Sequence, residues 1–503
     1  MLDVKYTTIA SLIKGSCTAK AGNELLVDEK DQCSGYLLWS KISSACRWLA
    51  DRGFEKGDVV AFCCASSIAH AVIFFACLVS GVVACCLHTR ETKKRNRENI
   101  EFISAKAIFV DPDIENQVKS LIKDDCVFVL PTEFKDIKAP EEVEITVNPD
   151  DLALILISSG TTGEPKCISH TQKTLAATAE YGPYNYGVST EEDSTIVIMA
   201  PSFAAWIHTV LPFIFIKGRI VFRNSFDPVS FLQTLENEKI TLAPLVPTIW
   251  RMVLTANPEH YDLSNLKSIF FSGEPGSDNL VEELQQKIGF NVITSYLASE
   301  GGCASGVVAD ANILSVKGQA ASTGYPIKDA EIRIIDPGGS FTENLPVGEI
   351  GEIAMKSTSV AAGYFGNSLL SKEKFLGGWW RSGDLGFIDN RGLLFVKGRL
   401  DNRINTGGVK VFAEEVEACL LRHPKVNFAA VVGITDKKWG QKVVAHVVSN
   451  DPDLMDSEIL NFCYENELLP RTHLPKEIYF HESLPVGPTG KLFRRGLYDR
   501  GFV

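Results

Sequence analysis

Apolar and polar positions alternate in blocks along this chain, and the blocks predict strands and helices in turn. Short apolar runs predict buried strands at 105–110, 195–199, 219–222 and 268–272. Amphipathic stretches between them predict helices at 230–238 and 278–288. Strands that alternate with helices are typical of stacked α/β layers, so we expect an α/β fold.

The apolar stretch 68–87 is long enough to suggest a membrane span. His70 and Gly81 interrupt it, and Gly81 separates a helix-like part from a short strand at 82–86. A buried helix that leads into a buried strand is typical of an α/β core, so we expect no integral membrane segment. The basic run 93–97 that follows is interpreted as a solvated helix face.

The pattern changes near Ala330, where strand-rich segments are broken by Gly-Gly and Pro-Gly turns, as in a small barrel or meander. A last unit begins near Asn402, with a helix at 414–422 and strands at 428–433 and 443–449. The chain has 503 residues, which exceeds the size at which a single core keeps growing. More than one domain is therefore expected.

Composition narrows the class of protein. Apolar residues make up 45% of the chain and the net charge is −12, which argues against a nucleic-acid or anionic-membrane partner. The thirteen cysteines are scattered, and the adjacent pairs Cys63-Cys64 and Cys85-Cys86 lack zinc-ligand spacing. With no signal peptide, we interpret them as buried, reduced thiols of a cytoplasmic protein.

The most distinctive chemistry lies at 158–166, where an apolar, strand-like run breaks into a loop rich in glycine and hydroxyl groups. Glycines let the backbone approach a ligand, hydroxyls and loop amides donate to phosphate oxygens, and a lysine adds positive charge. The spacing is not that of a Walker P-loop. This loop predicts polyphosphate binding by Ser158, Ser159, Gly160, Thr161, Thr162, Gly163 and Lys166.

Four further motifs follow the loop, and the five span roughly 150–495. They are Tyr296-Leu-Ala-Ser299-Glu300, Trp380-Arg-Ser-Gly-Asp384, the segment from Gly398-Arg399 through Glu417, and Leu484-Pro485 through Lys491. In this order the five motifs resemble those of the AMP-forming adenylate enzymes, which include acyl- and aryl-CoA ligases, firefly luciferase and peptide-synthetase adenylation domains.

The resemblance implies a fold with two parts and a mobile joint. Residues 1–398 would form the large N-terminal adenylation domain of stacked α/β layers with a small β-barrel-like part. Residues 399–401 would be the hinge, and 402–503 a small, mobile α+β C-terminal lid domain.

The resemblance also implies the first reaction, in which a carboxylate attacks the α-phosphorus of ATP and pyrophosphate leaves. Because two anions must meet, the site must supply positive charge. Lys166 and the loop would hold the β- and γ-phosphates, and Glu300 would carry Mg²⁺, since a hard cation prefers carboxylate oxygen. Ser299 would contact the α-phosphate, and Lys491 would bridge the carboxylate and the α-phosphate during attack.

The nucleotide would be held by the same set of motifs. Tyr296 would stack on adenine, in a pocket lined by Gly273, Glu274 and Pro275. Asp384 would accept hydrogen bonds from both ribose hydroxyls, with Arg399 beside the ribose and phosphate.

Taken singly, these residues have simpler explanations. Asp384 could serve a turn, Glu300 could cap a helix, Tyr296 could belong to a core, and Lys491 could be a solvated charge. Their joint occurrence in family order favours the functional interpretation.

The second reaction needs a thiol, from coenzyme A or from the phosphopantetheine of a carrier protein. Asp401 matches the family's hinge position, at which the small domain rotates between the two reactions. Gly407 and Gly408 would then line the approach of a pantetheine arm, where side chains would block it. The glycine pair fits both acceptors.

Two departures from the family bear on the acid. Ala204, after Phe203, stands where amino-acid-activating domains usually have Asp and many CoA ligases have His, so an amino acid substrate is not expected. Leu297 replaces the usual Gly and should narrow the acyl channel, which Trp206, His208 and Trp250 could also line. An apolar aryl or acyl acid is therefore expected.

Three functions follow in order of preference. The first is an ATP-dependent acid–CoA ligase, and the second is a stand-alone adenylating enzyme that loads an acyl or aryl carrier protein. The third is a non-catalytic relative that binds nucleotide or acid, against which the joint presence of Glu300, Asp384 and Lys491 argues.

Overall fold

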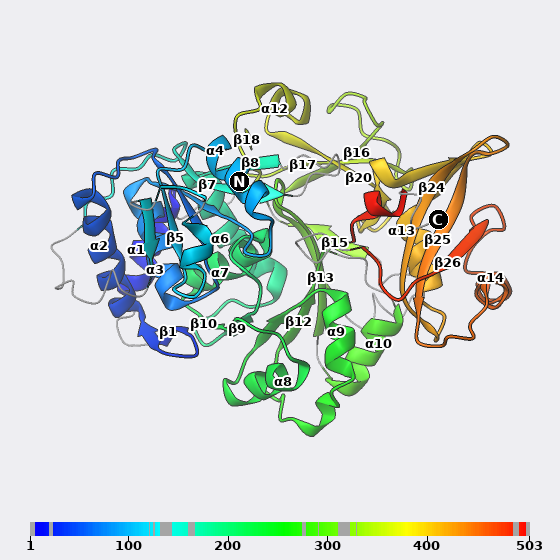
Figure 1. Ribbon diagram of the computed structural model, residues 1–503, viewed down its shortest axis with the longest axis horizontal. Helices are drawn as coiled ribbons and strands as arrows, with labels where there is room; N and C mark the ends of the chain where they lie inside the picture. Colours follow the sequence, from blue (N-terminus) through cyan, green and yellow to red (C-terminus); the bar gives the residue numbers. More distant parts are fainter. Residues whose placement is uncertain are drawn as a thin grey trace. The chain divides into compact units, whose positions relative to one another are not determined.

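The computed structural model describes residues 6–19, 24–119, 121–123, 126–130, 143–158, 166–273, 278–289, 291–309, 322–327, 329–485 and 492–498. The chain divides into two compact units (Figure 1). The first contains residues 1–332 and 354–381, and the second contains 333–353 and 382–503. This division differs from the predicted boundary at 398, which stays a prediction.

A seven-stranded sheet lies in the N-terminal part of the first unit, in the order β18-β8-β7-β4-β3-β5-β6. Strands β7, β4, β3, β5 and β6 are parallel, whereas β8 and β18 are antiparallel to their neighbours. The bounds are β3 Val59–Cys63, β4 Val83–Cys86, β5 Ala107–Val110, β6 Val127–Val129, β7 Leu152–Ser158, β8 Lys166–Thr171 and β18 Gly363–Tyr364.

Another run of paired strands in this unit has the order β15-β14-β13-β12-β11-β9-β10-β1-β2. It is parallel from β1 to β13 and antiparallel at both ends. The bounds are β1 Glu24–Val27, β2 Gln32–Ser34, β9 Ser194–Val197, β10 Arg219–Phe222, β11 Leu242–Pro244, β12 Ser268–Phe271, β13 Asn291–Ala298, β14 Gly302–Ala309 and β15 Ser322–Pro326.

The helices of the first unit form three layers around these sheets. Their bounds are α1 Ile9–Ala19, α2 Gly35–Asp51, α3 Ile68–Ser80, α4 Lys93–Phe102, α5 Glu115–Val118, α6 Gln172–Tyr186, α7 Ala204–Ile216, α8 Pro228–Asn237, α9 Pro247–Leu254, α10 Asp278–Lys287 and α12 Ser368–Lys374, with a 3-10 turn at Pro258–His260. Helices α1, α3, α6 and α7 share one core cluster with residues of both sheets, so they lie between the sheets. The outer faces are covered by α4 on one sheet and by α8 to α10 on the other.

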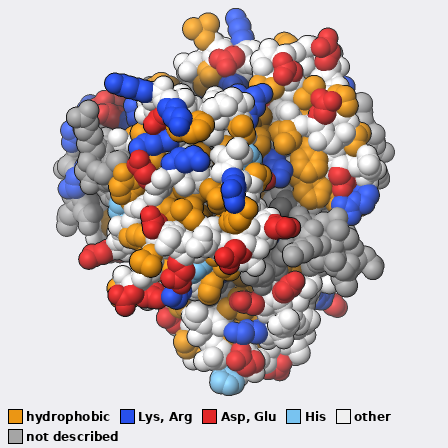
Figure 2. Space-filling model, turned by 90° about the vertical axis from the view of Figure 1, so that its right-hand side faces the viewer, with side chains coloured by type: hydrophobic (Ala, Val, Ile, Leu, Met, Phe, Trp, Pro, Cys, Tyr) orange, Lys and Arg blue, Asp and Glu red, His pale blue; other side chains and the backbone are white. Residues whose placement is uncertain are grey.

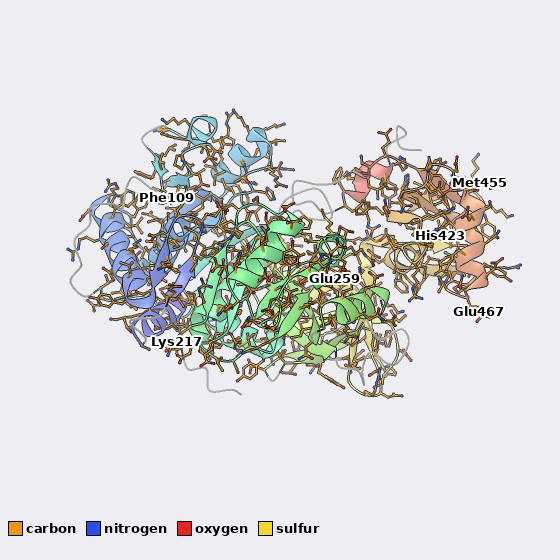
Figure 3. The ribbon with its side chains drawn as sticks, turned by 90° about the horizontal axis from the view of Figure 1, so that it is seen from below. Phe109, Lys217, Glu259, His423, Met455 and Glu467 are labelled. Carbon is orange, nitrogen blue, oxygen red and sulfur yellow. The ribbon has the colours of Figure 1, made fainter. Side chains whose placement is uncertain are left out.

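Alternation of side chains along each strand produces this layering. Val60 and Phe62 of β3 face the shared helices, while Ala61 faces the outer cluster. Phe109 of β5, labelled in Figure 3, is fully buried. Its ring stacks on Phe62 at 5.3 Å between centroids. The expected fold of stacked α/β layers is confirmed.

The apolar stretch 68–87 forms helix α3 followed by β4. Ser67 caps the helix by accepting from the His70 backbone N–H, and Gly81 ends it at φ +80°, where a side chain would be strained. Among the described residues, no helix is both long enough and apolar enough to cross a membrane. The basic run begins helix α4, as expected.

The second unit contains strand-rich segments and a small sheet. Its sheet has the order β23-β22-β25-β24, with β26 parallel to β25. The bounds are β16 Glu331–Ile335, β21 Leu394–Arg399, β22 Arg403–Thr406, β23 Val409–Phe412, α13 Ala413–Leu420, β24 Val426–Asp436, β25 Gly440–Ser449, α14 Asp456–Glu465 and β26 Glu477–Phe480, with 3-10 turns at Leu400–Asn402 and Arg494–Tyr498. Strands β16, β17 Gly351–Lys356 and β20 Trp379–Ile388 cross the unit boundaries, and β19 Phe375–Leu376 pairs with β20.

A buried ion pair and a hydrogen bond join the last turn of the described chain to helix α13 and strand β24. The Arg494 guanidinium donates to both carboxylate oxygens of Glu417 and, at 3.0 Å, to the Val431 carbonyl. Burial raises the pKa of Glu417, while the hydrogen bonds from Arg494 oppose that rise. In the same unit the His423 ring meets Phe462 of α14 edge-on at 4.9 Å (Figure 3).

Twelve described cysteines are free thiols, and eleven of them are buried. Burial raises the pKa of these eleven thiols; for Cys167 and Cys463 it reaches about 11. The interpretation of buried, reduced thiols therefore agrees with the structure of the described residues.

Acidic and basic side chains are interspersed over the face of the molecule shown in Figure 2.

We predict that His70 makes the fold sensitive to acid. Burial lowers its pKa to about 3, so the folded protein leaves it neutral while an unfolded chain protonates it below about pH 6.5. The contribution of neutral His70 to the free energy of unfolding is therefore fully present above pH 6.5. It is lost as the pH falls, by up to ~1.4 kcal/mol per pH unit. In His70→Phe, the free energy of unfolding should fall less steeply between pH 6.5 and 4.5.

Urea unfolding followed by tryptophan fluorescence measures this slope, since Trp206 lies 5.2 Å from the His70 ring. The matched control is His260→Phe at an exposed position, which should keep the wild-type slope. Equal slopes in all three proteins would contradict the prediction.

Candidate active site

The predicted phosphate loop joins two paired strands. β7 ends at Ser158 and β8 begins at Lys166, and these two residues lie opposite each other in the antiparallel register. Both are half-buried. Ser159, Gly160, Thr161, Thr162 and Gly163 lie outside the described residues. The structure therefore places the two ends of the predicted loop side by side at the carboxyl end of β7.

Glu300 lies in the turn between β13 and β14. Its neighbour Gly301 has no room for a side chain, because a Cβ there would come within 2.1 Å of the Met355 terminal carbon. Gly302 has φ +63° and would meet Ser359. The Glu300-Gly301-Gly302 turn thus depends on glycine for both its conformation and its packing.

Tyr296 and Leu297 lie at the end of β13, on either side of a break in the strand register. Such irregularities change the direction of side chains near active sites. Tyr296 is nearly buried, and Leu297 is half-buried against Ala177 and Tyr181 of α6. Ser299 follows in the turn and is half-buried.

Tyr364 brings Lys166 and Glu300 together, although the sequence analysis did not identify it. Its hydroxyl donates to Glu300 Oε1 at 3.1 Å, and Lys166 Nζ lies 5.5 Å from the centroid of its ring. Tyr364 is buried, in the short strand β18. The predicted phosphate and metal residues are therefore linked through one aromatic side chain.

His170 makes a second link between the two sheets. Its Nε2 lies 2.8 Å from the Ser299 carbonyl oxygen, to which it must donate, and its Nδ1 lies 3.2 Å from the Thr174 hydroxyl. Burial lowers the pKa of His170 to about 4, so the imidazole is neutral near pH 7. It holds the backbone of the turn without adding charge.

Asp384 and Arg399 form an ion pair within the second unit. They lie opposite each other on β20 and β21, and Arg399 Nη1 donates to Asp384 Oδ1 at 2.8 Å. The same nitrogen donates to the Ser382 carbonyl at 3.2 Å, and the Ser382 hydroxyl accepts from the Asp384 N–H at 2.9 Å. The carboxylate is thus oriented by the strand pair, and its ribose role stays a prediction.

The residues predicted for hinge motion and thiol access lie in turns of the second unit. Asp401 is exposed in the 3-10 turn Leu400–Asn402. Gly407 and Gly408 connect β22 to β23 at φ +57° and +83°, and a Cβ on Gly407 would come within 2.9 Å of the Trp439 ring. The hinge role of Asp401 and the thiol-access role of the two glycines stay predictions.

Apart from Leu297, the main predicted acid-pocket residues are at the start of α7. Phe203 precedes the helix and meets the His88 ring edge-on at 5.1 Å, and Ala204 is half-buried. Trp206 is fully buried, and its Nε1 donates to the Ser66 hydroxyl at 3.0 Å. Burial lowers the pKa of His208 to about 3. Trp206 and His208 therefore have packing roles, and their part in a pocket stays a prediction.

The remaining predicted residues divide in two groups. Gly273 is described, exposed and at φ +83° after β12. Glu274, Pro275 and Lys491 lie outside the described residues.

The chemistry of this site is compatible with Mg²⁺. Among the described residues, no cluster of three or more His, Cys, Asp or Glu could hold a metal. Mg²⁺ is usually bound through one or two carboxylates together with substrate phosphates, which a single Glu300 beside a phosphate loop can provide.

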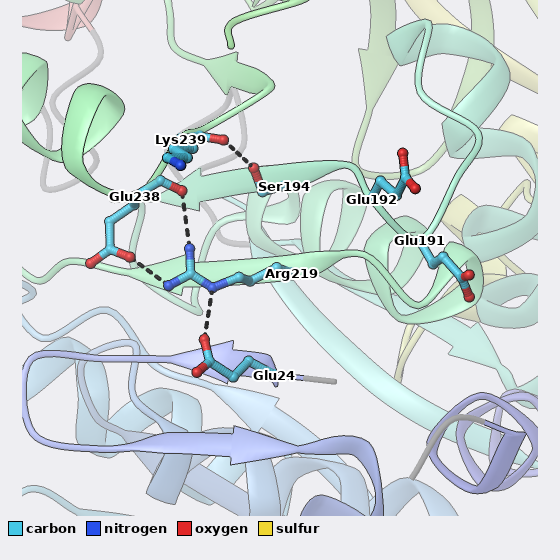
Figure 4. A pocket seen from close by; sticks show the side chains of 7 residues that line it. All are labelled: Glu24, Glu191, Glu192, Ser194, Arg219, Glu238 and Lys239. Carbon is cyan, nitrogen blue, oxygen red and sulfur yellow. Dashed lines mark hydrogen bonds and ion pairs between the residues drawn. The ribbon is translucent and has the colours of Figure 1, made fainter. Parts of the chain in front are cut away.

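A hollow on the first unit is lined by residues outside the motifs: Glu24, Glu191, Glu192, Ser194, Arg219, Glu238 and Lys239 (Figure 4). Arg219 makes ion pairs with Glu24 at 3.3 Å and with Glu238 at 2.5 Å. Arg219 is thus paired within the hollow, and none of the predicted site residues lines it, so it is not our candidate site.

Comparison with known proteins agrees with the motifs. A model described as AMP-binding enzyme matches residues 14–365, and one described as AMP-binding enzyme C-terminal domain matches 415–491. A 2-succinylbenzoate–CoA ligase of Bacillus licheniformis is 28% identical over 446 residues, covering 88% of this chain and 90% of the relative. A 4-coumarate–CoA ligase of Narcissus pseudonarcissus is 27% identical over 471 residues, covering 89% and 85%.

Solved structures of the o-succinylbenzoate–CoA synthetase of Bacillus subtilis have the same fold. One contains the acyl-adenylate intermediate and another contains ATP and a magnesium ion. Both align with a TM-score of 0.87 at 24% identity, covering 97% of this chain and 98% or 99% of theirs. Because the first family model alone matches more than half of the chain, this protein belongs to the AMP-binding enzyme family.

Proposed function

We propose that this protein is an AMP-forming acid–CoA ligase that uses ATP, Mg²⁺ and coenzyme A. The observation that carries the proposal is the convergence of Lys166 and Glu300 on Tyr364, beside the turn that continues from β13. The two CoA ligases described above are similar over most of this chain, which favours coenzyme A over a carrier protein as the acceptor.

In the first reaction, a carboxylate oxygen of the acid bonds to the α-phosphorus of ATP and the bond to the β-phosphate oxygen breaks. Lys166 and the loop donors would hold the leaving pyrophosphate, and Lys491 would stabilise the charge between the two anions. Glu300 would hold Mg²⁺, which when bound neutralises phosphate charge. The products are acyl-AMP and pyrophosphate.

In the second reaction, the sulfur of coenzyme A bonds to the acyl carbon, AMP leaves with the bonding electrons, and the thiol proton passes to solvent. Asp401 would be the pivot that removes Lys491 between the two reactions. Gly407 and Gly408 would then leave space for the pantetheine arm.

The acid that we propose is apolar and aromatic or aliphatic, without an amino group. Ala204 supplies no anion to meet an ammonium group. Leu297 fills space beside Ala177 and Tyr181 that a glycine would leave open. Both named relatives act on carboxylic acids that contain an aromatic ring, which favours an aryl acid. The cytoplasmic location stays a prediction.

The proposal is tested with the purified protein, ATP, Mg²⁺ and a panel of aryl, fatty and amino acids. Pyrophosphate release should rise with an apolar acid, and turnover should continue only when coenzyme A is supplied. If no acid releases pyrophosphate, the ligase proposal is wrong. Turnover with a phosphopantetheinylated carrier protein but not with coenzyme A would favour the carrier-loading alternative.

We predict that Lys491→Ala blocks the first reaction and spares the second. Loss of one charged transition-state contact should slow adenylate formation by at least ~10²-fold. Thioester formation from supplied acyl-AMP and coenzyme A should stay close to wild type. Single-turnover assays of each reaction measure the two rates. An equal loss of rate in both reactions would contradict the role of Lys491.

We predict that Leu297→Gly shifts acid preference toward bulkier acids. Removing a half-buried side chain beside α6 should deepen the pocket, and each added methylene is worth about 1–3 kcal/mol of discrimination. A competition series of acids of increasing size measures the preference. If both proteins rank the series identically, Leu297 does not face the acyl channel.

A further inference from the structure

Tyr364 is held in place by main-chain bonds to both parts of the candidate site. Residues Gly363 and Tyr364 pair with Ser169 and Ile168 of β8, the strand that begins at Lys166. On the other side, the Ala361 N–H donates to the Glu300 carbonyl at 2.8 Å. The segment that carries Tyr364 is thus bonded to the strand of the lysine and to the turn of the carboxylate.

The ring and hydroxyl of Tyr364 are fixed independently of any ligand. The Tyr364 N–H donates to the Ser371 hydroxyl at 2.9 Å, and the Phe375 ring meets the tyrosine ring edge-on at 5.3 Å. Its side chain is buried, with a relative exposure of 7%. Its position is therefore set by the fold before nucleotide arrives.

Tyr364 contacts two charged side chains of the candidate site at once. Tyr186, for comparison, donates its hydroxyl to a backbone carbonyl, that of His208. Tyr364 instead donates to the Glu300 carboxylate and presents its ring to the Lys166 ammonium. A hydrogen bond to one carboxylate oxygen restrains rotation of the group, and an aromatic face attracts a cation without neutralising it.

We propose that Tyr364 is a positioning residue that orients Glu300 for Mg²⁺ and Lys166 for the phosphates of ATP. The hydroxyl acts on the metal carboxylate, and the ring acts on the lysine. This inference rests on the proposed function. Partners that hydrogen-bond to metal-binding carboxylates typically change metal affinity or activity by 10–100-fold when they are removed.

The hydroxyl and the ring can be separated by substitution. Tyr364→Phe keeps the ring and removes only the bond to Glu300, so it should raise the Mg²⁺ concentration for half-maximal ATP binding by about 10-fold or more. Its binding of ATP in the presence of EDTA should equal that of wild type. Tyr364→Leu also removes the ring, so it should weaken binding of metal-free ATP as well.

Calorimetric titration of ATP without acid, at a series of Mg²⁺ concentrations, measures these effects apart from turnover. The matched control is Tyr479→Phe, which removes a tyrosine hydroxyl bonded to another glutamate, Glu477, at 2.8 Å. This variant should keep the wild-type Mg²⁺ dependence. At saturating Mg²⁺, the adenylation rate of Tyr364→Phe should return to near that of wild type.

A double-substitution cycle isolates the link to Glu300. In the Glu300→Gln background, Tyr364→Phe should cause no further change in the Mg²⁺ dependence, because the carboxylate that the hydroxyl orients is gone. An effect as large as in the wild-type background would overturn the proposal.

The outcomes distinguish the inference from the proposed function. If wild type binds Mg²⁺·ATP and Tyr364→Phe has the same Mg²⁺ dependence, the role of Tyr364 is wrong while the ligase proposal stands. If Tyr364→Phe weakens ATP binding equally with and without Mg²⁺, the tyrosine is only structural. If wild type itself does not bind Mg²⁺·ATP, the proposed function fails.

Discussion

Two sheets share a single layer of buried helices, and this packing constraint determines where their strand ends meet. Helix α3 shows how completely the layer is enclosed, since eleven of the thirteen residues of this helix are buried. A helix enclosed in this way is apolar on nearly every side, and burial keeps its His70 neutral. With the layer filled, β8 of one sheet and the turn after β13 of the other come close enough for His170 and Tyr364 to bond across. The candidate site is a product of that spacing.

Much of the fold could be predicted because its signals are local. The break at Gly81 marks the end of α3, and the change in periodicity near Ala330 marks a different architecture. Lys166 and Glu300 were found because charged residues stand within distinctive short motifs. The sequence could not show which strands belong to which sheet, since strand order depends on contacts between residues far apart in the chain.

The sequence analysis did not identify Tyr364 and His170 for the same physical reason. Tyr364 contacts Glu300 across 64 positions, and His170 contacts Ser299 across 129. An aromatic residue in Gly-Tyr-Phe-Gly carries no charge that would mark it as part of a site. Asp384 and Arg399 were each predicted, but their ion pair arises from the register of β20 and β21, which no local pattern specifies.

The burial of the cysteines has a consequence for an enzyme whose second substrate is itself a thiol. Oxidised coenzyme A can form mixed disulfides with proteins, and the attacking species in that exchange is a thiolate. Eleven described cysteines are buried with raised pKa values, so they are neither accessible nor ionised near neutral pH. At these eleven thiols, the fold thus opposes formation of a mixed disulfide with the cosubstrate.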